Sequence, residues 1–448
     1  MRQLHQCVWL ACLLNLPAIL AAQEPEAAQI NELRAELAQL RTDYDRRIAD
    51  LESRLAAAEA QTSETASNPP AVFAPAVASS GGNRDFNPAI GVIFQGQAWA
   101  YDQDPENYTV PGHPFGGEAG PVPEGFALGE TEIDISANVD DLFTAWLTLP
   151  IVIEDGDTHV EIEEAWIETL ALPAGFSARM GRMFSNIGYL NQQHSHGWDF
   201  VDQPLPYQAF LGNQYLDDGL RLSWVAPTDL YFQLGAEVLR GDRYPSVGAA
   251  NSGFGAWTAH AVLGGDVGIS NYWQAGLSYL SGESIDRPSG DEDDPLLFTG
   301  DSDLMIAEFV WKWSPNGNWR ERNFKVQAEY LRRSEKGGYT LTDSVESPYD
   351  SNQDGWYLQA VYQPFPQWRF GIRYDTLSTD DPGQLFEGTP LDPGRRDPWR
   401  YSLMADWSHS EFSRIRLQYT HDEATTPSDD QWGLQYIYSI GAHGAHSF

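Results

Sequence analysis

Apolar and polar residues alternate along most of the chain after residue 87. The final segment, residues 431–448, shows the pattern most clearly, and it ends at Phe448. A strand with lipid on one side and water on the other requires this period of two. The segment therefore predicts a membrane-facing β-strand. Its apolar face consists of Trp432, Leu434, Tyr436, Tyr438 and Ile440.

Ten further segments repeat this two-faced pattern, which makes eleven with the last one. Their apolar faces carry no Asp, Glu, Lys or Arg, although charged residues make up 20% of the chain. Lysine or arginine that faces the middle of a bilayer costs about 2–4 kcal/mol, so a lipid-facing wall excludes them. The ten segments are residues 219–224, 230–238, 257–263, 273–279, 305–313, 324–330, 356–362, 368–374, 401–407 and 415–419.

Five more strands are expected upstream, at residues 89–101, 126–137, 143–153, 158–170 and 176–184. The first is the least regular, because two sets of its apolar residues compete for the outer face. Sixteen strands fit the connections, in which short turns alternate with longer loops. The sheet is expected to close into an all-β transmembrane barrel, because an open strand edge in hydrocarbon leaves backbone groups unpaired. An even number of strands predicts that both termini are periplasmic.

The residues before the barrel divide into three parts. Residues 1–22 are typical of a signal peptide, with Arg2 before a short apolar run that contains both cysteines. Residues 23–61 predict a short α-helical coiled coil, because apolar residues recur every three or four positions from Ile30. Residues 62–86 are rich in Pro, Ser and Gly and predict a linker to the β-barrel at 87–448. The coil implies self-association, whereas a single helix lying on the barrel is the alternative.

The chain carries a formal net charge of −37, from 64 acidic and 27 basic residues. Many acidic residues fall in residues 281–301, a presumed outer loop where solvent or divalent ions bridging to lipopolysaccharide would balance them. We expect outer-membrane lipid, lipopolysaccharide and small solutes as partners, with no cofactor and no nucleic acid. No Ser/His/Asp or paired-carboxylate arrangement has a spacing that indicates an enzyme.

Charged residues at lumen-facing positions suggest two opposite walls. Acidic residues belong to the second and fourth strands, and basic residues to strands eleven to fifteen. We expect a transverse field across the pore that orients polar solutes; the alternative is that these charges pair with neighbours along each wall. The acidic positions are Glu130, Glu132, Asp134, Glu161 and Glu163, and the basic positions are Lys325, Arg369, Arg373, Arg414 and Arg416.

The longest presumed outer loop, residues 185–217, is the candidate constriction loop. Its aromatic and proline content favours a packed loop, and its candidate residues are His194, His196, Trp198, Asp199 and Asp202. Imidazole and carboxylate together suit a transition metal, so His194, His196 and Asp199 are a candidate metal site. Polar lining of the pore is the simpler interpretation.

Residues 178–184, Ala-Arg-Met-Gly-Arg-Met-Phe, followed by Ile187-Gly188, resemble a strand motif of the phosphate-selective porin family, in which a Gly-Arg pair precedes the third outer loop. The terminal Phe448 is similar to the last residue of bacterial outer-membrane barrels. These resemblances imply a Gram-negative outer-membrane porin, a homotrimer, and recognition of Phe448 by the barrel-assembly machinery. The chain lacks the dense Lys and Arg ladder of that family, which argues against phosphate selectivity.

Three functions follow from these features. A channel for passive or facilitated diffusion of small polar or charged solutes is favoured. A dedicated uptake channel for a transition metal or metal chelate is the second. A structural tether that acts through the coiled coil is the third.

Overall fold

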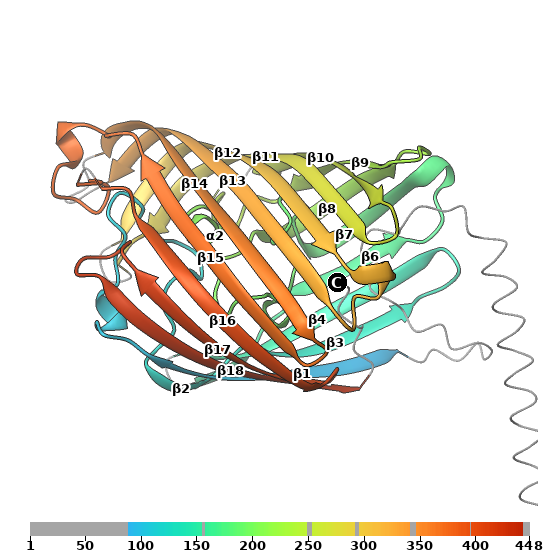
Figure 1. Cartoon of the computed structure of the whole chain (residues 1–448). Helices are drawn as coiled ribbons and strands as arrows, with labels where there is room; N and C mark the ends of the chain where they lie inside the picture. Colours follow the sequence, from blue (N-terminus) through green and yellow to red (C-terminus); the bar gives the residue numbers. More distant parts are fainter. Residues whose placement is uncertain are drawn as a thin grey trace, which may run out of the picture. The chain divides into compact units, whose positions relative to one another are not determined.

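The computed structural model describes residues 88–154, 157–248, 253–291, 295–340, 346–394 and 396–441. The expected signal peptide, coiled coil, linker and Phe448 lie outside these residues. Eighteen β-strands form one antiparallel sheet (Figure 1). They are β1 (Ala89–Ala100), β2 (Gly125–Leu128), β3 (Thr131–Asn138), β4 (Phe143–Glu154), β5 (Asp157–Val160), β6 (Glu164–Thr169), β7 (Phe176–Phe184), β8 (Leu216–Val225), β9 (Tyr231–Leu239), β10 (Ala256–Val267), β11 (Asn271–Ser289), β12 (Leu296–Trp313), β13 (Asn323–Thr340), β14 (Glu346–Phe365), β15 (Trp368–Thr379), β16 (Trp399–Ser410), β17 (Ser413–Asp422) and β18 (Asp429–Gly441).

The sheet closes on itself, because β1 pairs with β18 at one side and with β2 and β3 at the other. β5 and β6 likewise share one partner, β4. The two interrupted pairs, β2/β3 and β5/β6, each act as one strand of the barrel, so the eighteen segments make sixteen barrel strands. The prediction of a sixteen-strand antiparallel barrel is therefore confirmed.

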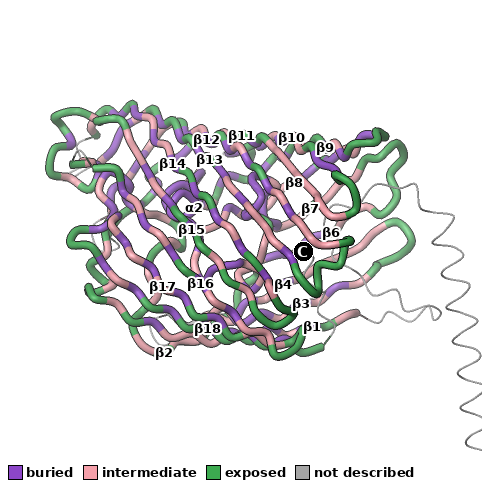
Figure 2. The backbone as a smooth tube through the Cα atoms, viewed as in Figure 1, coloured by how far each residue is buried: buried purple, intermediate pink, exposed green. Residues whose placement is uncertain are grey.

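Buried and more exposed residues alternate along the strands (Figure 2), as expected for side chains that point in turn into and out of the barrel. On β18, Leu434 is 44% exposed and Gln435 is 4% exposed. The ambiguity in the first strand is resolved, because Ile90 and Phe94 face outward while Ile93 is fully buried. The outward apolar faces of the predicted segments thus form a continuous exterior of the kind that hydrocarbon requires.

Strands β11 to β14 extend well past the apolar exterior, in contrast to the prediction of a loop at 281–301. Residues 281–289 belong to β11 and residues 296–301 to β12. The outer face becomes charged in this extension, where Arg332 lies 3.9 Å from Asp354. The acidic residues Glu283, Asp286 and Asp301 therefore belong to strands that continue beyond the apolar exterior.

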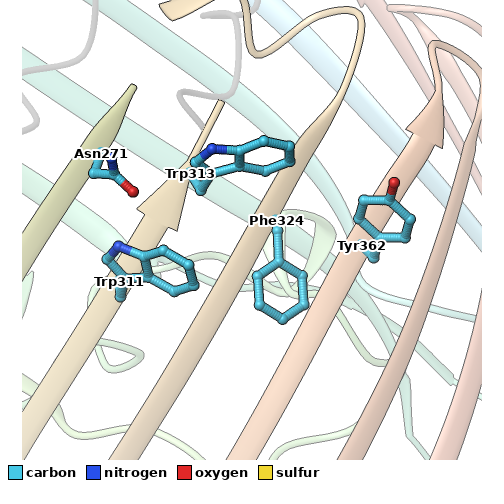
Figure 3. A pocket seen from close by; sticks show the side chains of 5 residues that line it. All are labelled: Asn271, Trp311, Trp313, Phe324 and Tyr362. Carbon is cyan, nitrogen blue, oxygen red and sulfur yellow. The ribbon is translucent and has the colours of Figure 1, made fainter. Parts of the chain in front are cut away.

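Aromatic side chains gather on the outer face at the opposite ends of β12, β13 and β14, beside the short turns. Trp311 and Trp313 on β12, Phe324 on β13 and Tyr362 on β14 line a shallow groove there with Asn271 of β11 (Figure 3). Phe324 makes edge-to-face contacts with Trp311 and Tyr362, at ring-centre distances of 5.8 and 6.2 Å. Aromatic clusters at this level are typical of the interface girdle of a membrane barrel.

The one α-helix that the described residues contain, α2 (Leu205–Leu211), lies inside the barrel (Figure 1). It follows Pro204 and ends at Gly212, whose φ of 62° permits the left-handed C-cap. All seven helical residues are buried. Short 3₁₀ helices are η1 (Pro105–Asn107), η2 (Pro173–Gly175), η3 (Ser195–Gly197), η5 (Pro315–Gly317) and η6 (Gln384–Phe386).

An apolar cluster surrounds α2 and fills part of the interior. Its members come from α2, from the loops and from inward-facing positions of the strands. Burial of each large apolar side chain contributes about 1.5–3 kcal/mol, so the helix is held mainly by packing. Strand residues of the cluster include Leu304, Ile306, Leu331, Tyr357 and Leu377. No helix among the described residues is long and apolar enough to cross a bilayer.

Candidate functional site: a loop across the barrel interior

Pro150 in β4 organises the acidic side of the barrel interior. A proline has no N–H for the ladder and is tolerated in sheets at bulges. On one side of β4, Pro150 faces Glu132 of β3, and on the other its carbonyl accepts a hydrogen bond from the Glu161 N–H at 3.1 Å. Both neighbouring strands are interrupted near this point, β2/β3 at 129–130 and β5/β6 at 161–163.

Each interruption is a bulge of one extra residue. Between β5 and β6, four residue steps from Val160 to Glu164 face three steps from Ile151 to Thr148. A bulge breaks the alternation of side chains and re-aims those beside it. Consequently Glu163 and the adjacent Glu164 both contact the same histidine of the loop inside the barrel, although they are consecutive in sequence.

Loop L3, residues 185–215, presents its histidines to these carboxylates. His194 Nδ1 lies 3.3 Å from Glu132 Oε2 and 3.1 Å from Glu163 Oε2, and its Nε2 lies 3.2 Å from Glu164 Oε2. His196 Nδ1 lies 3.0 Å from Glu132 Oε1. Burial alone would lower the pKa of His194, but the charges of Glu163 and Glu132 outweigh it and raise that pKa well above its ordinary value.

The aspartates of L3 face the basic side instead. Asp199 Oδ2 lies 2.5 Å from Lys325 Nζ, and its Oδ1 lies 3.1 Å from Arg369. Asp202 pairs with Arg373 at 2.8 Å and with Arg400 at 3.0 Å. Burial alone would raise the pKa of Asp199, but the charges of Lys325 and Arg369 lower it below its ordinary value.

Backbone carbonyls of L3 accept hydrogen bonds from further basic side chains of the barrel wall. Arg416 donates to the carbonyls of Phe200 at 2.9 Å and Trp198 at 2.6 Å, and Arg414 reaches the carbonyl of His196 at 3.5 Å. Charged hydrogen bonds of this kind are stronger than neutral ones. The segment from His194 to Asp202 is thus fixed along its whole length by side chains of the barrel wall.

Other residues of L3 bind to strands β9, β10 and β13. The Asn186 N–H donates to Glu237 of β9 at 2.9 Å, and Asn186 Nδ2 lies 2.7 Å from His260 of β10. The Tyr189 N–H and the Tyr207 hydroxyl donate to Glu329 of β13 at 2.8 and 3.0 Å. L3 therefore crosses the interior and is bound to strands around most of the ring.

Loop L1, residues 101–124, packs over α2 of L3. The ring of His113 lies 6.2 Å from that of Phe210, and Gln353 of β14 donates to the Gly112 carbonyl at 2.8 Å. His113 is fully buried. Burial and the charge of Arg333 lower the pKa of His113 to about 4, so this side chain is neutral at pH 7.

The two predicted walls are recognisable around L3, but the basic wall does not lie entirely opposite the acidic one. Lys325 belongs to the eleventh barrel strand and faces the third, whereas Arg414 and Arg416 on the fifteenth lie only three strands from β3. The two charged groups therefore meet L3 from neighbouring sectors as well as from across the lumen. Glu161 is exposed, in contrast to Glu163 and Glu164, which both contact His194.

The predicted metal site is also corrected. Asp199 does not join His194 and His196, because both its oxygens are bound to Lys325 and Arg369. Among the described residues, one group of three potential ligands has its atoms within 4.8 Å of one another, and it comprises Glu132, Glu163 and His194.

Two charged residues of the site were missing from the prediction. Arg400 is 3% exposed and pairs with Asp375 at 2.9 Å as well as with Asp202. Continuing the alternation of β16 one position before Tyr401 would have placed Arg400 inward. Glu164 could not be found in this way, because the bulge before it reverses the alternation.

The remaining predicted residues have these positions. Glu130, at the first bulge, hydrogen-bonds Ser195 and Glu163. Asp134 accepts a hydrogen bond from Thr148 at 2.8 Å. The Trp198 indole donates to the Gln193 carbonyl at 2.6 Å and stays within L3.

A closed sixteen-strand barrel with an apolar exterior and an inward-folded third loop has the porin fold. Solved structures that share this fold include two bacterial outer-membrane proteins. The outer membrane channel DcaP of Acinetobacter baumannii is 12% identical, with a TM-score of 0.51, and the match covers 79% of this chain and 97% of that chain. OmpT of Vibrio cholerae in its trimer form is 9% identical, with a TM-score of 0.50, and the match covers 79% and 99%.

Sequence comparison places the chain more narrowly. An uncharacterized protein of Aquifex aeolicus (strain VF5) is 32% identical over 343 residues, which cover 72% of this chain and 70% of that protein. The chain belongs to the same family as this Aquifex protein. No family model matches the sequence.

Proposed function

We propose that the chain is a Gram-negative outer-membrane channel through which small polar or charged solutes diffuse, with L3 as its constriction. One observation carries the proposal: L3 is held inside a closed barrel by oppositely charged side chains, its histidines by carboxylates and its aspartates by arginines and a lysine. A solute that crosses the barrel must pass this loop.

The distribution of charged side chains across the constriction supports selection of solutes by an electric field. On the acidic side, Glu132, Glu163 and Glu164 face at most two imidazolium groups. On the basic side, Lys325 and five arginines face four aspartates. Neither side is fully balanced, so an acidic and a basic excess remain on different sectors of the interior. Low-dielectric walls strengthen such a field.

Reversal potentials in a salt gradient test this proposal. Planar-bilayer currents should show a conducting wild-type channel. Glu163→Gln should shift the reversal potential toward anion selectivity, and Arg414→Gln should shift it toward cation selectivity. Glu411→Gln, in the turn between β16 and β17, and Arg240→Gln remove the same charges at exposed positions and should leave the reversal potential within a few millivolts. A wild-type protein without conductance would refute the channel, and equal shifts in variants and controls would refute the field.

We also propose a homotrimer with both termini in the periplasm, because the apolar seam of residues 23–61 needs a partner. Light scattering of the detergent-purified chain should give three copies, and deletion of residues 23–61 tests whether the coil is required. A monomeric full-length chain would refute this assembly. The same deletion should leave conductance intact, which separates transport from a tethering role.

A further inference from the structure

We propose that Glu132, Glu163 and His194 form a binding site for one divalent transition-metal ion, which fastens L3 to the acidic side of the barrel. The ligand atoms are Glu132 Oε2, Glu163 Oε2 and His194 Nδ1, all within 4.8 Å of one another. The site consists of residues of this chain alone and does not depend on whether the barrel conducts.

The same three atoms lack hydrogen bonds. Glu132 Oε2, Glu163 Oε2 and His194 Nδ1 are each buried without a hydrogen-bond partner, and the Glu132 side chain is 0% exposed. The histidine nitrogen lies within ion-pair distance of both oxygens, so the three atoms converge on one point. Buried polar atoms are rarely left in this state without a ligand, because each costs about 1–3 kcal/mol.

The distances also fit a small ion. Zinc binds imidazole nitrogen and carboxylate oxygen at about 2.0–2.2 Å, which places two tetrahedral ligand atoms about 3.3–3.5 Å apart. His194 Nδ1 lies 3.3 Å from Glu132 Oε2 and 3.1 Å from Glu163 Oε2. Small side-chain shifts would therefore complete three ligands and leave a fourth position open to water or solute.

Neighbouring groups orient the ligands. His194 Nε2 lies 3.2 Å from Glu164 Oε2, the partner that a metal-bound imidazole commonly has on its second nitrogen. His196 Nδ1 lies 3.0 Å from Glu132 Oε1, so the other oxygen of that carboxylate stays available. Such outer contacts fix the ring and raise the basicity of the ligand nitrogen.

Charge and donor type indicate the class of ion. Three carboxylates, those of Glu132, Glu163 and Glu164, contact the two histidines, and a divalent cation would offset this excess. One imidazole among the donors favours zinc, iron, nickel or copper over calcium or magnesium, which prefer oxygen alone. The competing arrangement is a protonated His194 that bridges the carboxylates without a metal.

Calorimetry on the full chain in detergent, after removal of metal with a chelator, tests the site with ZnCl₂ as the probe. One zinc ion per chain is expected. Glu163→Gln and His194→Gln should each weaken binding at least tenfold. Glu161→Gln removes the same charge two residues from Glu163, at an exposed position, and should change the affinity less than twofold. Heat-modifiable migration on gels checks that every variant is folded.

Three outcomes would overturn the proposal: no saturable zinc binding by the wild type, equal weakening by Glu161→Gln, or calcium binding as tight as zinc binding. Cobalt provides a measurement that needs no variant, because visible d–d bands of the wild-type protein with CoCl₂ should appear and should be lost on adding zinc. Conductance measured on the same preparation keeps the two proposals apart, since a conducting channel that binds no zinc would overturn the metal site alone.

Discussion

Substitution of Asp199 by asparagine should release the middle of L3 from the basic side of the barrel. Asp199 is 5% exposed and binds Lys325 at 2.5 Å, Arg369 at 3.1 Å and Gln359 at 3.0 Å. Removing one member of a buried ion pair costs about 3–5 kcal/mol, because the remaining charge stays buried without its partner. Asparagine keeps an acceptor for Gln359, so we expect the lower end, about 3 kcal/mol.

A loss of about 3 kcal/mol corresponds to about a hundredfold change in the ratio of docked to undocked loop. Hydrogen exchange followed by mass spectrometry measures this directly. The Val201 N–H donates to Gln418 at 2.8 Å, so peptides covering residues 196–204 should exchange about a hundredfold faster in Asp199→Asn. Peptides from β14 should be unaffected, since strand pairing holds the barrel itself.

Two controls make the result decisive. Asp229→Asn removes the same charge from an exposed turn and should leave exchange in 196–204 unchanged. Adding Lys325→Gln to Asp199→Asn should cost less than the sum of the single changes, because the lysine is no longer left buried and unpaired. Unchanged exchange in 196–204, or equal acceleration throughout the barrel, would refute the docking argument.

Three further predictions concern other parts of the interior. Gly181→Ala should reduce the yield of folded barrel, because φ is +132° and an added Cβ would lie 2.1 Å from a backbone oxygen of β6. Gly96→Ala, where an added Cβ would meet its nearest atom at 3.9 Å, should fold normally on heat-modifiability gels. The pKa of His113 is about 4 in the folded protein and about 6.5 in an exposed loop, so L1 is docked most stably above pH 6.5. As the pH falls toward 4, the docking of L1 should lose up to about 3 kcal/mol, which hydrogen exchange would report as faster exchange of residues 101–124. His113→Gln should abolish this pH dependence. Phe210→Ala should cost about 3–5 kcal/mol of α2 docking through the cavity it leaves, with exchange in 205–211 as the measurement and unchanged protection as the refuting result.

The barrel could be predicted from the sequence because strand alternation is a local property. Lipid excludes charged residues from the outward face of each strand. The alternation within a segment such as 368–374 therefore indicates which side faces outward, without knowledge of the neighbouring strands. Closure follows from the cost of free edges. The extensions of β11 and β12 were missed because residues 281–301 have charged outer positions, which resemble loop sequence once the strand leaves the apolar exterior.

The site was only partly predictable, because it depends on contacts between distant residues. The inward orientation of Lys325 and Arg373 follows from alternation alone. That L3 delivers His194 to Glu132 and Asp199 to Lys325 follows from the path of a folded loop, which has no sequence period. The bulge opposite Pro150 adds a one-residue shift that brings Glu164 to the site beside Glu163.

The short distance that L3 can cover between the acidic and the basic side of the barrel explains why the side chains that bind it are long. From His194 to Asp199 the chain advances five residue steps, which reach about 17 Å at most when fully extended. Within that distance L3 passes from the carboxylates of β3 and β6 to Lys325 of β13. Long side chains must therefore extend inward from the wall, which explains why the basic contacts are lysine and arginine. Shortening one of them should loosen L3 even where the charge is retained, so Arg416→Lys, which cannot reach two carbonyls with one planar group, should accelerate exchange in 196–204.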